Sequence, residues 1–504
     1  MKSKIYDYIF IIILVLSIIF GLYRFYPYFF SDVPLGYDPG LYRRMFIDYF
    51  SSLPYVDFAS FRPRTREAYP PYIGLMGNTF HIIGYNVDFL ITYMLAIFGS
   101  ITSIYIYLYL KKYSQTTAII GIIIFFISII QYESFYLNYY KQILGIIFML
   151  VGLYLLEKKK YLLSIPIIIS MFTVNRPAGV FFVIMLVFYV LYDILVGIFK
   201  SKKSILLAKD CTFIKTDKTI VQKLCGFASL YNRNILYILL TVLFSGIIAL
   251  FMYLPLIDEQ ILSLIKPLTT TFLVSGTSGT FFSLEDFVGY NFFIIILSIY
   301  GIYVKIQKRD FDFTTIGYLV GLLWIIFRLF FYNRFLITFD IYIILIAAYG
   351  LGHLYSKKKL FLFIFVLFFG IQSYIYIDYL NENGIPFIPK SEFELMQKLD
   401  TMLPNDSMIM VTHRHYTPRL FGYTDLPVIA PSMFEYDLWE KSDWNNWLAS
   451  DGIEKCKMIN DYKIYNKDIY IWLGVDQIKE NLDGADCFEI IYESGENKVL
   501  RVKN

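Results

Sequence analysis

The sequence is poor in charge, cysteine and histidine. Charged residues make up 17% of the 504 positions, and the formal net charge is only +4. So small a charge does not favour a nucleic-acid partner, which needs a strongly basic surface. Of the four cysteines, Cys211 and Cys225 lack the further ligands of a zinc site. His413 and His415 alternate, and a strand would point them to opposite faces, so we favour no metal site there.

Hydrophobic residues, in contrast, make up 57% of the chain. This composition is typical of a polytopic α-helical membrane protein. The first apolar run has no small-residue cleavage site after it and is expected to remain as an anchor. Eleven runs are long enough to be read as spans. They lie near 8–28, 86–109, 115–132, 142–156, 161–174, 178–199, 235–256, 290–306, 314–332, 335–354 and 360–378.

Lysine marks one end of these runs. If the N-terminus is cytoplasmic, every lysine cluster falls on the cytoplasmic face, as the positive-inside rule requires. We therefore predict a multi-pass protein of the cell membrane whose region from about 384 lies outside. The clusters are Lys2/Lys4, Lys111/Lys112, Lys158/Lys159/Lys160, Lys200/Lys202/Lys203, Lys305/Lys308 and Lys357/Lys358/Lys359.

The predicted outer face carries mostly arginine instead. Orientation does not require this, and a planar guanidinium grips a phosphate at two points where lysine offers only one. The set indicates an anionic, phosphorylated substrate, although any single arginine could instead reach out to lipid headgroups. Its members are Arg24, Arg43, Arg44, Arg62, Arg64, Arg66, Arg176 and Arg334.

A proline-bearing acidic turn lies in the first outer loop, residues 29–85. Asp38 stands between Gly36-Tyr37 and Pro39-Gly40, in a tight turn. Its carboxylate could act as a general base or bind a divalent metal, with Asp32 as a second acidic group. The alternative is that Asp38 caps a helix that starts near Gly40. Arg43 follows at once and is a candidate phosphate ligand.

Other polar residues fall at the ends of predicted spans. Glu133, at the outer end of the third span, could complete a metal site. Arg176 opens the sixth span and Arg334 the tenth. Arg328 is predicted within the ninth span, where a charge is costly and usually functional. Together with Arg176 and Arg334 it is a candidate ligand of the donor phosphate. Glu285 is a weaker acidic candidate, in a second outer loop (257–289) that could close over a substrate or simply connect two spans.

The chain after about 384 is more polar and has the size of a small α/β domain. We predict an amphipathic helix over 391–403 and strands over 408–412, 426–429, 469–473 and 488–492. Cys456 and Cys487 both fall in this domain, where an outer location would permit a disulfide. The predicted organisation is a membrane domain, 1–383, with a catalytic outer loop at 29–85, and an extracytoplasmic domain, 384–504.

The order of these motifs resembles a known group. Gly36-Tyr37-Asp38-Pro39 follows the first span, then Tyr69-Pro70-Pro71-Tyr72-Ile73-Gly74-Leu75, then Asn175-Arg176-Pro177-Ala178-Gly179, then Asn333-Arg334-Phe335-Leu336. Over most of residues 1–378 this resembles the GT-C superfamily of integral membrane glycosyltransferases. That group includes protein O-mannosyltransferases, aminoarabinose transferases and the catalytic subunits of oligosaccharyltransferase.

The resemblance implies transfer of a sugar from a polyprenyl-phosphate or polyprenyl-diphosphate donor at the outer face. Asp38 would be the catalytic base or a metal ligand, with Mn²⁺ or Mg²⁺ as the ion, and Arg334 and Arg176 would hold the lipid phosphate. The acceptor could be a lipid, a glycan or a protein. The Trp-Trp-Asp-Tyr-Gly motif of oligosaccharyltransferases is missing, which favours a general lipid-linked transferase over an oligosaccharyltransferase. A lipid-linked sugar flippase and a non-catalytic scaffold are the alternatives of other classes.

Overall fold

The computed structural model describes most of the chain. The described residues are 32–36, 38–51, 71–208, 233–254, 282–329, 332–355, 358–413, 416–431, 438–474, 485–494 and 497–503, with a few positions between 12 and 22. Contacts divide the chain into two compact units. Unit 1 comprises residues 1–20, 98–134 and 141–381, and unit 2 comprises 21–97, 135–140 and 382–504. The predicted functional division at 383 stays a prediction.

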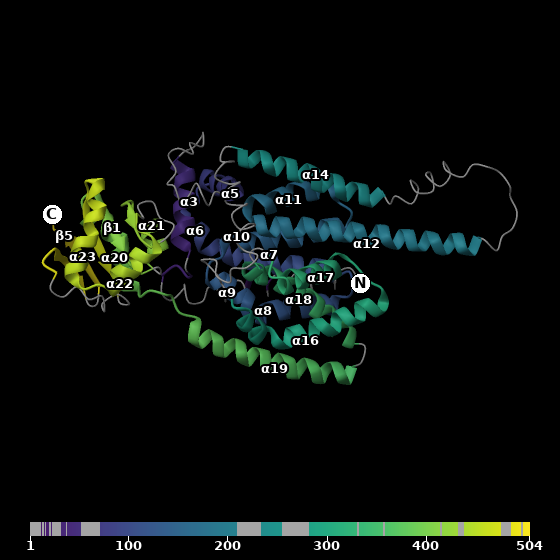
Figure 1. Ribbon diagram of the computed structural model, residues 1–504. Coiled ribbons are helices and arrows are strands. Elements are labelled where there is room, and N and C mark those ends of the chain that lie inside the picture. The colour runs from purple at the N-terminus through teal and green to yellow at the C-terminus, as the bar shows by residue number, and fades with distance from the viewer. Residues whose placement is uncertain are drawn as a thin grey trace. The chain divides into compact units, whose positions relative to one another are not determined.

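Unit 1 is a bundle of apolar helices (Figure 1). Seven described helices are long and apolar enough to cross a membrane, or eight if one bent pair counts as a span. The chain is therefore a membrane protein. The helices are α7 (Tyr93–Leu110), α8 (Gln115–Ile127), α9 (Ile129–Tyr136), α10 (Tyr140–Glu157), α11 (Tyr161–Val174), α12 (Arg176–Ala208), α14 (Arg233–Tyr253), α16 (Leu284–Lys308), α17 (Phe313–Ile326), α18 (Tyr332–Leu354) and α19 (Lys358–Asn383).

The predicted number of eleven spans is not confirmed. The predicted span 115–132 is broken at Ser128, where α8 and α9 meet at 56°. At the predicted spans 161–174 and 314–332 the structure has α11 (Tyr161–Val174) and α17 (Phe313–Ile326). Each has 14 residues, which is short for a helix that crosses a bilayer. Apolar runs thus located the helices, while the break and the short lengths depend on tertiary packing.

Helix α18 forms the centre of unit 1, with 94% of its most apolar window buried. It packs closely on α16 because glycines face each other at the crossing. A Cβ at Gly301 would lie 2.2 Å from the backbone oxygen of Ile346, and one at Gly350 would lie 2.9 Å from the backbone of Gly301. Small residues of this kind allow helix backbones to approach in apolar surroundings.

An ion network joins helix ends on one side of unit 1. Lys112, in the turn between α7 and α8, donates to Glu157 at 2.7 Å and to Asp312 at 2.9 Å. Lys305, at the end of α16, donates to Asp310 at 2.9 Å and lies 3.2 Å from Asp312. Lys112 and Lys305, which were predicted to lie on the same membrane face, therefore share Asp312 as a partner. The assignment of this face to the cytoplasm stays a prediction.

Each charged group of this network stabilises the charged form of its partners. Burial opposes the charge of Lys112, but Tyr109, Asp312 and Glu157 outweigh burial and raise its pKa above the ordinary value. Burial likewise opposes the charge of Asp312, but Lys112 and Lys305 outweigh it and lower the pKa of this carboxyl. Both groups therefore remain charged through the neutral range.

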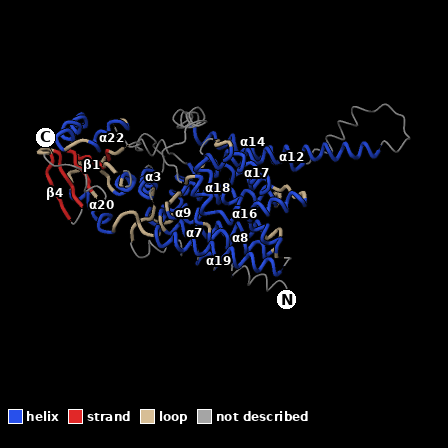
Figure 2. The backbone as a smooth tube through the Cα atoms, turned by 60° about the horizontal axis from the view of Figure 1, so that its bottom comes forward, coloured by secondary structure: helices blue, strands red, loops and turns tan. Residues whose placement is uncertain are grey.

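Unit 2 contains three helices from the first part of the chain and a small α/β domain, in which all the described strands lie (Figure 2). The strands form a mixed sheet in the order β2-β1-β3-β5-β4, with β1, β2 and β3 parallel. The elements are α3 (Pro39–Ser51), α5 (Pro71–Ile82), α6 (Val87–Ile91), α20 (Lys390–Met402), β1 (Ser407–Val411), α21 (Thr417–Tyr423), β2 (Val428–Ile429), α22 (Lys441–Ala449), α23 (Gly452–Met458), a 3-10 helix (Ile459–Tyr465), β3 (Asp468–Leu473), β4 (Phe488–Ser494) and β5 (Asn497–Val502).

The predicted helix at 391–403 and the four predicted strands are confirmed, whereas β5 was missed. The tryptophan-rich stretch of this domain is its core, because Trp439, Trp444 and Trp447 are all buried against the sheet. Cys456 and Cys487 form a disulfide, which the sequence had left as one possibility. Cys211 and Cys225 lie outside the described residues.

Candidate functional site

Asp38 immediately precedes helix α3. Its backbone oxygen accepts the N–H of Tyr42 at 3.2 Å, and Pro39 occupies the first helical position, which suits a residue without an N–H. The side chain of Asp38 is only partly buried. Asp38 thus stands at the N-cap position of α3 through its backbone, and both roles considered for its side chain stay predictions.

The turn before Asp38 packs against a second turn far along the chain. Gly36 has φ +83°, and a Cβ there would lie 2.3 Å from the backbone of Leu137. Tyr42 and Phe46 of α3 meet the ring of Tyr140 at centroid distances of 5.4 and 5.9 Å. The turn before Asp38 therefore lies beside the turn that contains Leu137, within unit 2.

The charged residues around this turn bind to protein groups of unit 2. Arg43 donates to Asp88 at 3.0 Å and to the backbone oxygen of Gly422 at 2.7 Å, with its guanidinium over the ring of Tyr423. Asp32 pairs with Lys390 at 3.1 Å and is exposed. These contacts give Arg43 a positioning role, because it holds α3 against α6 and α21.

In unit 1, Asn175 fixes the position of Arg176. Its Oδ1 accepts the N–H of Ala178 at 3.2 Å and so caps α12, which makes Arg176 the first residue of that helix. Its Nδ2 donates to Gln142 Oε1 on α10 at 2.6 Å. A glycine at position 145 permits this approach, since a Cβ there would lie 3.0 Å from Asn175. The guanidinium of Arg176 lies 5.0 Å from the ring centre of Tyr253.

Two contacts bring Arg334 to the same end of unit 1. Gln142 also donates its Nε2 to the hydroxyl of Thr338, one turn beyond Arg334 on α18. The ring of Phe335 meets Phe181 of α12 at a centroid distance of 4.3 Å. Since a helix rises 1.5 Å per residue, Arg176 lies roughly 8 Å along α12 from this ring contact.

The first turns of α10, α12 and α18 therefore gather at one end of the bundle, with Lys141, Arg176 and Arg334 on them. Helix N-termini carry partial positive charge, which adds to that of the side chains. Such an arrangement suits an anion such as a phosphate. The sequence did not predict that Gln142 and Asn175 join these helices, because an amide can pair with any of many partners.

The structure corrects the prediction for Arg328. Helix α17 ends at Ile326, so Arg328 lies in the exposed turn after the helix and not within a span. Glu285 is exposed in the first turn of α16, where Ser283 caps the helix by accepting the N–H of Asp286 at 2.9 Å.

Glu133 lies on α9, the second half of the broken span. Its carboxylate accepts the hydroxyl of Tyr379 on α19 at 2.7 Å. Among the described residues no three histidine, cysteine, aspartate or glutamate side chains gather as a metal site would require. The described part of neither unit offers a set of carboxylates that fits Mn²⁺ or Mg²⁺ by itself, so we derive no step through a metal.

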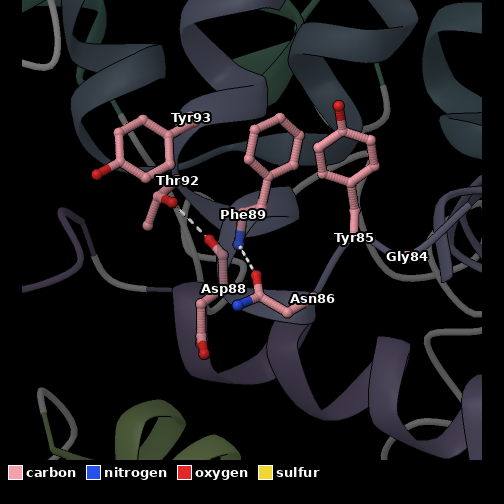
Figure 3. A pocket seen from close by; sticks show the side chains of 7 residues that line it. All are labelled: Gly84, Tyr85, Asn86, Asp88, Phe89, Thr92 and Tyr93. Atoms are coloured by element: carbon pink, nitrogen blue, oxygen red, sulfur yellow. Dashed lines mark hydrogen bonds between the residues drawn. The ribbon is translucent and has the colours of Figure 1, made fainter.

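A surface pocket of about 460 Å³ lies in unit 2, just before the first residues of α7 (Figure 3). Figure 3 shows the rings of Tyr85, Phe89 and Tyr93 in a row on one side of it, with Asn86 and Asp88 on the other. Neighbouring rings are 4.5 and 6.1 Å apart. An aromatic group at the start of a candidate span is typical of a membrane–water interface. The other two lining residues are Gly84 and Thr92. None of the seven lining residues was a predicted site residue.

Comparison with known proteins finds likeness in structure alone. No family model and no curated protein matches the chain. The oligosaccharyltransferase of Archaeoglobus fulgidus in its apo form matches with a TM-score of 0.60 at 12% identity, over 93% of this chain and 70% of that one. The same enzyme, AglB, with an inhibitory peptide and a dolichol-phosphate matches with 0.60 at 12% identity, over 92% and 69%. Its complex with zinc and sulfate matches with 0.58 at 12% identity, over 97% and 73%. The chain therefore has a GT-C-like fold, which it shares with an archaeal oligosaccharyltransferase.

Proposed function

We propose that this chain is a membrane glycosyltransferase that transfers a sugar from a polyprenyl-phosphate-linked donor to a lipid, glycan or protein acceptor. The observation that carries the proposal is the gathering of Arg176 and Arg334 at one end of unit 1. The contacts Asn175–Gln142 and Phe181–Phe335 hold this arrangement. The fold agrees with it, since the similar archaeal enzyme was solved with a dolichol-phosphate.

The two arginines would bind the phosphate of the donor. In the reaction an acceptor oxygen or nitrogen attacks the anomeric carbon, and the bond from that carbon to the phosphate oxygen breaks. The phosphate leaves with the electron pair, and fixed positive charge stabilises it most where its charge develops. Asp38 would take the proton that the acceptor loses. Arg328 stays outside this proposal because it is exposed, and Arg43 because of its contacts within unit 2.

The test is turnover of labelled polyprenyl-phosphate and polyprenyl-diphosphate sugars by the purified protein in lipid, with and without Mn²⁺ or Mg²⁺. Replacing one guanidinium by an ammonium, Arg334→Lys or Arg176→Lys, should lower kcat by roughly 10²–10³-fold, since lysine cannot reproduce the two-point grip. Arg309→Gln is the matched control, because Arg309 is exposed at the far end of α16. Equal rates for all four proteins would refute the phosphate role.

Asp38→Asn separates capping from chemistry. Asparagine caps helices as well as aspartate does, so the variant should fold with an unchanged melting temperature. It has no carboxylate to accept a proton, so turnover should be lost. A variant that keeps full turnover would remove Asp38 from the mechanism.

A second candidate is transfer of a lipid-linked oligosaccharide to protein, which the likeness to an archaeal oligosaccharyltransferase over most of the chain favours. The same assay with a peptide acceptor and a lipid-linked oligosaccharide donor distinguishes the two, because only this candidate moves a whole oligosaccharide to the peptide, whereas the first candidate moves a single sugar. Movement of the donor across the bilayer without loss of its sugar would instead indicate a flippase.

A further inference from the structure

A buried polar cluster lies in the middle of unit 1, and none of its residues was a predicted site residue. Asp340 is the ninth of the 23 residues of α18 and is fully buried. Its carboxylate accepts the hydroxyl of Ser128 at 2.8 Å, the amide of Gln131 at 3.0 Å and the amide of Asn291 at 2.7 Å. Ionisable residues at this depth of an apolar helix are costly and usually functional.

The cluster surrounds the break between α8 and α9. Ser128 occupies the break and accepts the N–H of Gln131, so it caps α9. Gln372, on α19, donates to the backbone oxygens of Ile127 at 3.4 Å and Tyr290 at 3.1 Å. Those two residues immediately precede Ser128 and Asn291, which puts Gln372 beside the same cluster. Four helices and a helix end thus direct oxygen atoms to one buried region; α16 and α18 are seen side by side in Figure 1.

Three amide oxygens in this region have no hydrogen-bond partner within the described part of the chain. They belong to Gln131, Asn291 and Gln372, all of which are fully buried. An amide oxygen lies about 2.3 Å from its own nitrogen, so those of Gln131 and Asn291 fall within about 5 Å of the Asp340 carboxylate. A buried acceptor without a donor costs about 1–3 kcal/mol, and such atoms in native proteins usually contact water or an ion.

We propose that this cluster is a binding site for a small dehydrated monovalent cation such as sodium. The ligands are the Asp340 carboxylate and the amide oxygens of Gln131 and Asn291, with Gln372 completing the set. Oxygen atoms are what hard cations prefer, and carbonyl groups at broken helices serve this purpose in membrane proteins. The single carboxylate of the ligand set balances one positive charge, which favours a monovalent ion over a divalent one.

The amides permit two states. A half turn of an amide group exchanges its N–H₂ for its oxygen at nearly the same position. In one state Gln131 and Asn291 donate to Asp340, as their distances here indicate. In the other state both turn their oxygens to a cation that the carboxylate also contacts. One ion would satisfy the carboxylate and all the amide oxygens together, whereas one water has only two hydrogens to donate.

The test is the thermal stability of the full chain in lipid nanodiscs, followed by far-ultraviolet circular dichroism, which reports the helices of unit 1. Chloride salts of sodium, potassium and N-methyl-D-glucamine are compared at equal ionic strength. Sodium should raise the melting temperature in a saturable manner by on the order of 3 °C. Asp340→Asn and Asn291→Leu should abolish this rise, while Asp378→Asn, an exposed carboxylate of α19, should retain it.

Equilibrium binding of radioactive sodium to the wild-type protein needs no variant and should approach one ion per chain. Absence of saturable binding would overturn the proposal and leave water as the partner of the amide oxygens. Sodium binding that survives both Asp340→Asn and Asn291→Leu would also overturn it. Neither measurement uses a sugar donor, so their outcome is separate from that of the proposed activity.

Discussion

Replacing Gly422 by alanine should detach helix α3 from helix α21. A Cβ at Gly422 would lie 2.1 Å from the backbone oxygen of Gly40, and one at Gly40 would lie 2.0 Å from the backbone oxygen of Pro418. Ordinary contacts of a Cβ begin near 3.4 Å, so the helices would have to separate by 1.3 Å, the difference between 3.4 and 2.1 Å. The neighbours are backbone atoms and cannot turn aside as a flexible side chain can.

The expected cost follows from two contributions. Overpacking of a tight contact costs about 1–3 kcal/mol, and a gap of this size loses much of the dispersion energy along both helices. The separation also lengthens the bond from Arg43 to the Gly422 oxygen, a charge-assisted bond worth about 1.5–3 kcal/mol. We expect about 3 kcal/mol in all, which corresponds to a fall in melting temperature of roughly 6–12 °C for a unit of this size.

Tryptophan fluorescence is a suitable assay, because four of the five tryptophans lie in unit 2. Gly289→Ala, in α16 of unit 1, controls for the glycine-to-alanine change itself and should leave the melt of unit 2 unchanged, since its Cβ would meet nothing within 4 Å in an exposed helical position. The double variant Gly40→Ala/Gly422→Ala should cost less than the two single variants together, because either one already opens the contact. If the melting temperature of Gly422→Ala lies within about 1–2 °C of wild type, as for a surface substitution, this reasoning is refuted.

Three further predictions concern the ion network and the disulfide. Asp312→Asn should destabilise unit 1 by about 3–5 kcal/mol, because it leaves Lys112 and Lys305 short of a buried partner, although asparagine can still cap α17. Thermal circular dichroism measures this, and Asp310→Asn, which removes the more exposed partner of Lys305 and leaves Lys112 paired, should cost less than Asp312→Asn. The pKa of Asp312 is lowered and that of Lys112 is raised, so their contribution to the stability of unit 1 is fully present above about pH 4 and below about pH 10. The difference in melting temperature between wild type and Asp312→Asn should therefore be constant from pH 5 to 9 within about 1 °C. A steep change near neutrality would contradict this prediction. Reduction of Cys456–Cys487, which closes a loop of 31 residues, should lower the stability of the small α/β domain by about 3–4 kcal/mol. If dithiothreitol leaves the fluorescence melt unchanged, the disulfide does not stabilise this domain.

The local character of the elements was accessible from the sequence. Apolar length predicted most of the helices, because a segment that crosses a bilayer must satisfy its backbone internally and cover it with apolar side chains. Alternation and turn residues predicted four strands of the small domain, and Pro39 after Asp38 predicted the start of α3. These features depend on residues close together in the chain, so local physics was sufficient for them. Strand β5 was missed because its burial is set by β3 and β4 on either side of it.

Tertiary structure decided which polar residues meet. Gln142 and Asn175 carry no local signal, yet their amide contact determines that Arg176 and Arg334 share one end of the bundle. Arg328 was predicted inside a span because the apolar run continues past it, but α17 ends two residues earlier. Asp340 was not among the predicted site residues, because a single aspartate in an apolar helix gives no information about the side chains that pack against it. Burial, pairing and the close approach of glycines all depend on a second segment of chain, and only the folded arrangement brings that segment near.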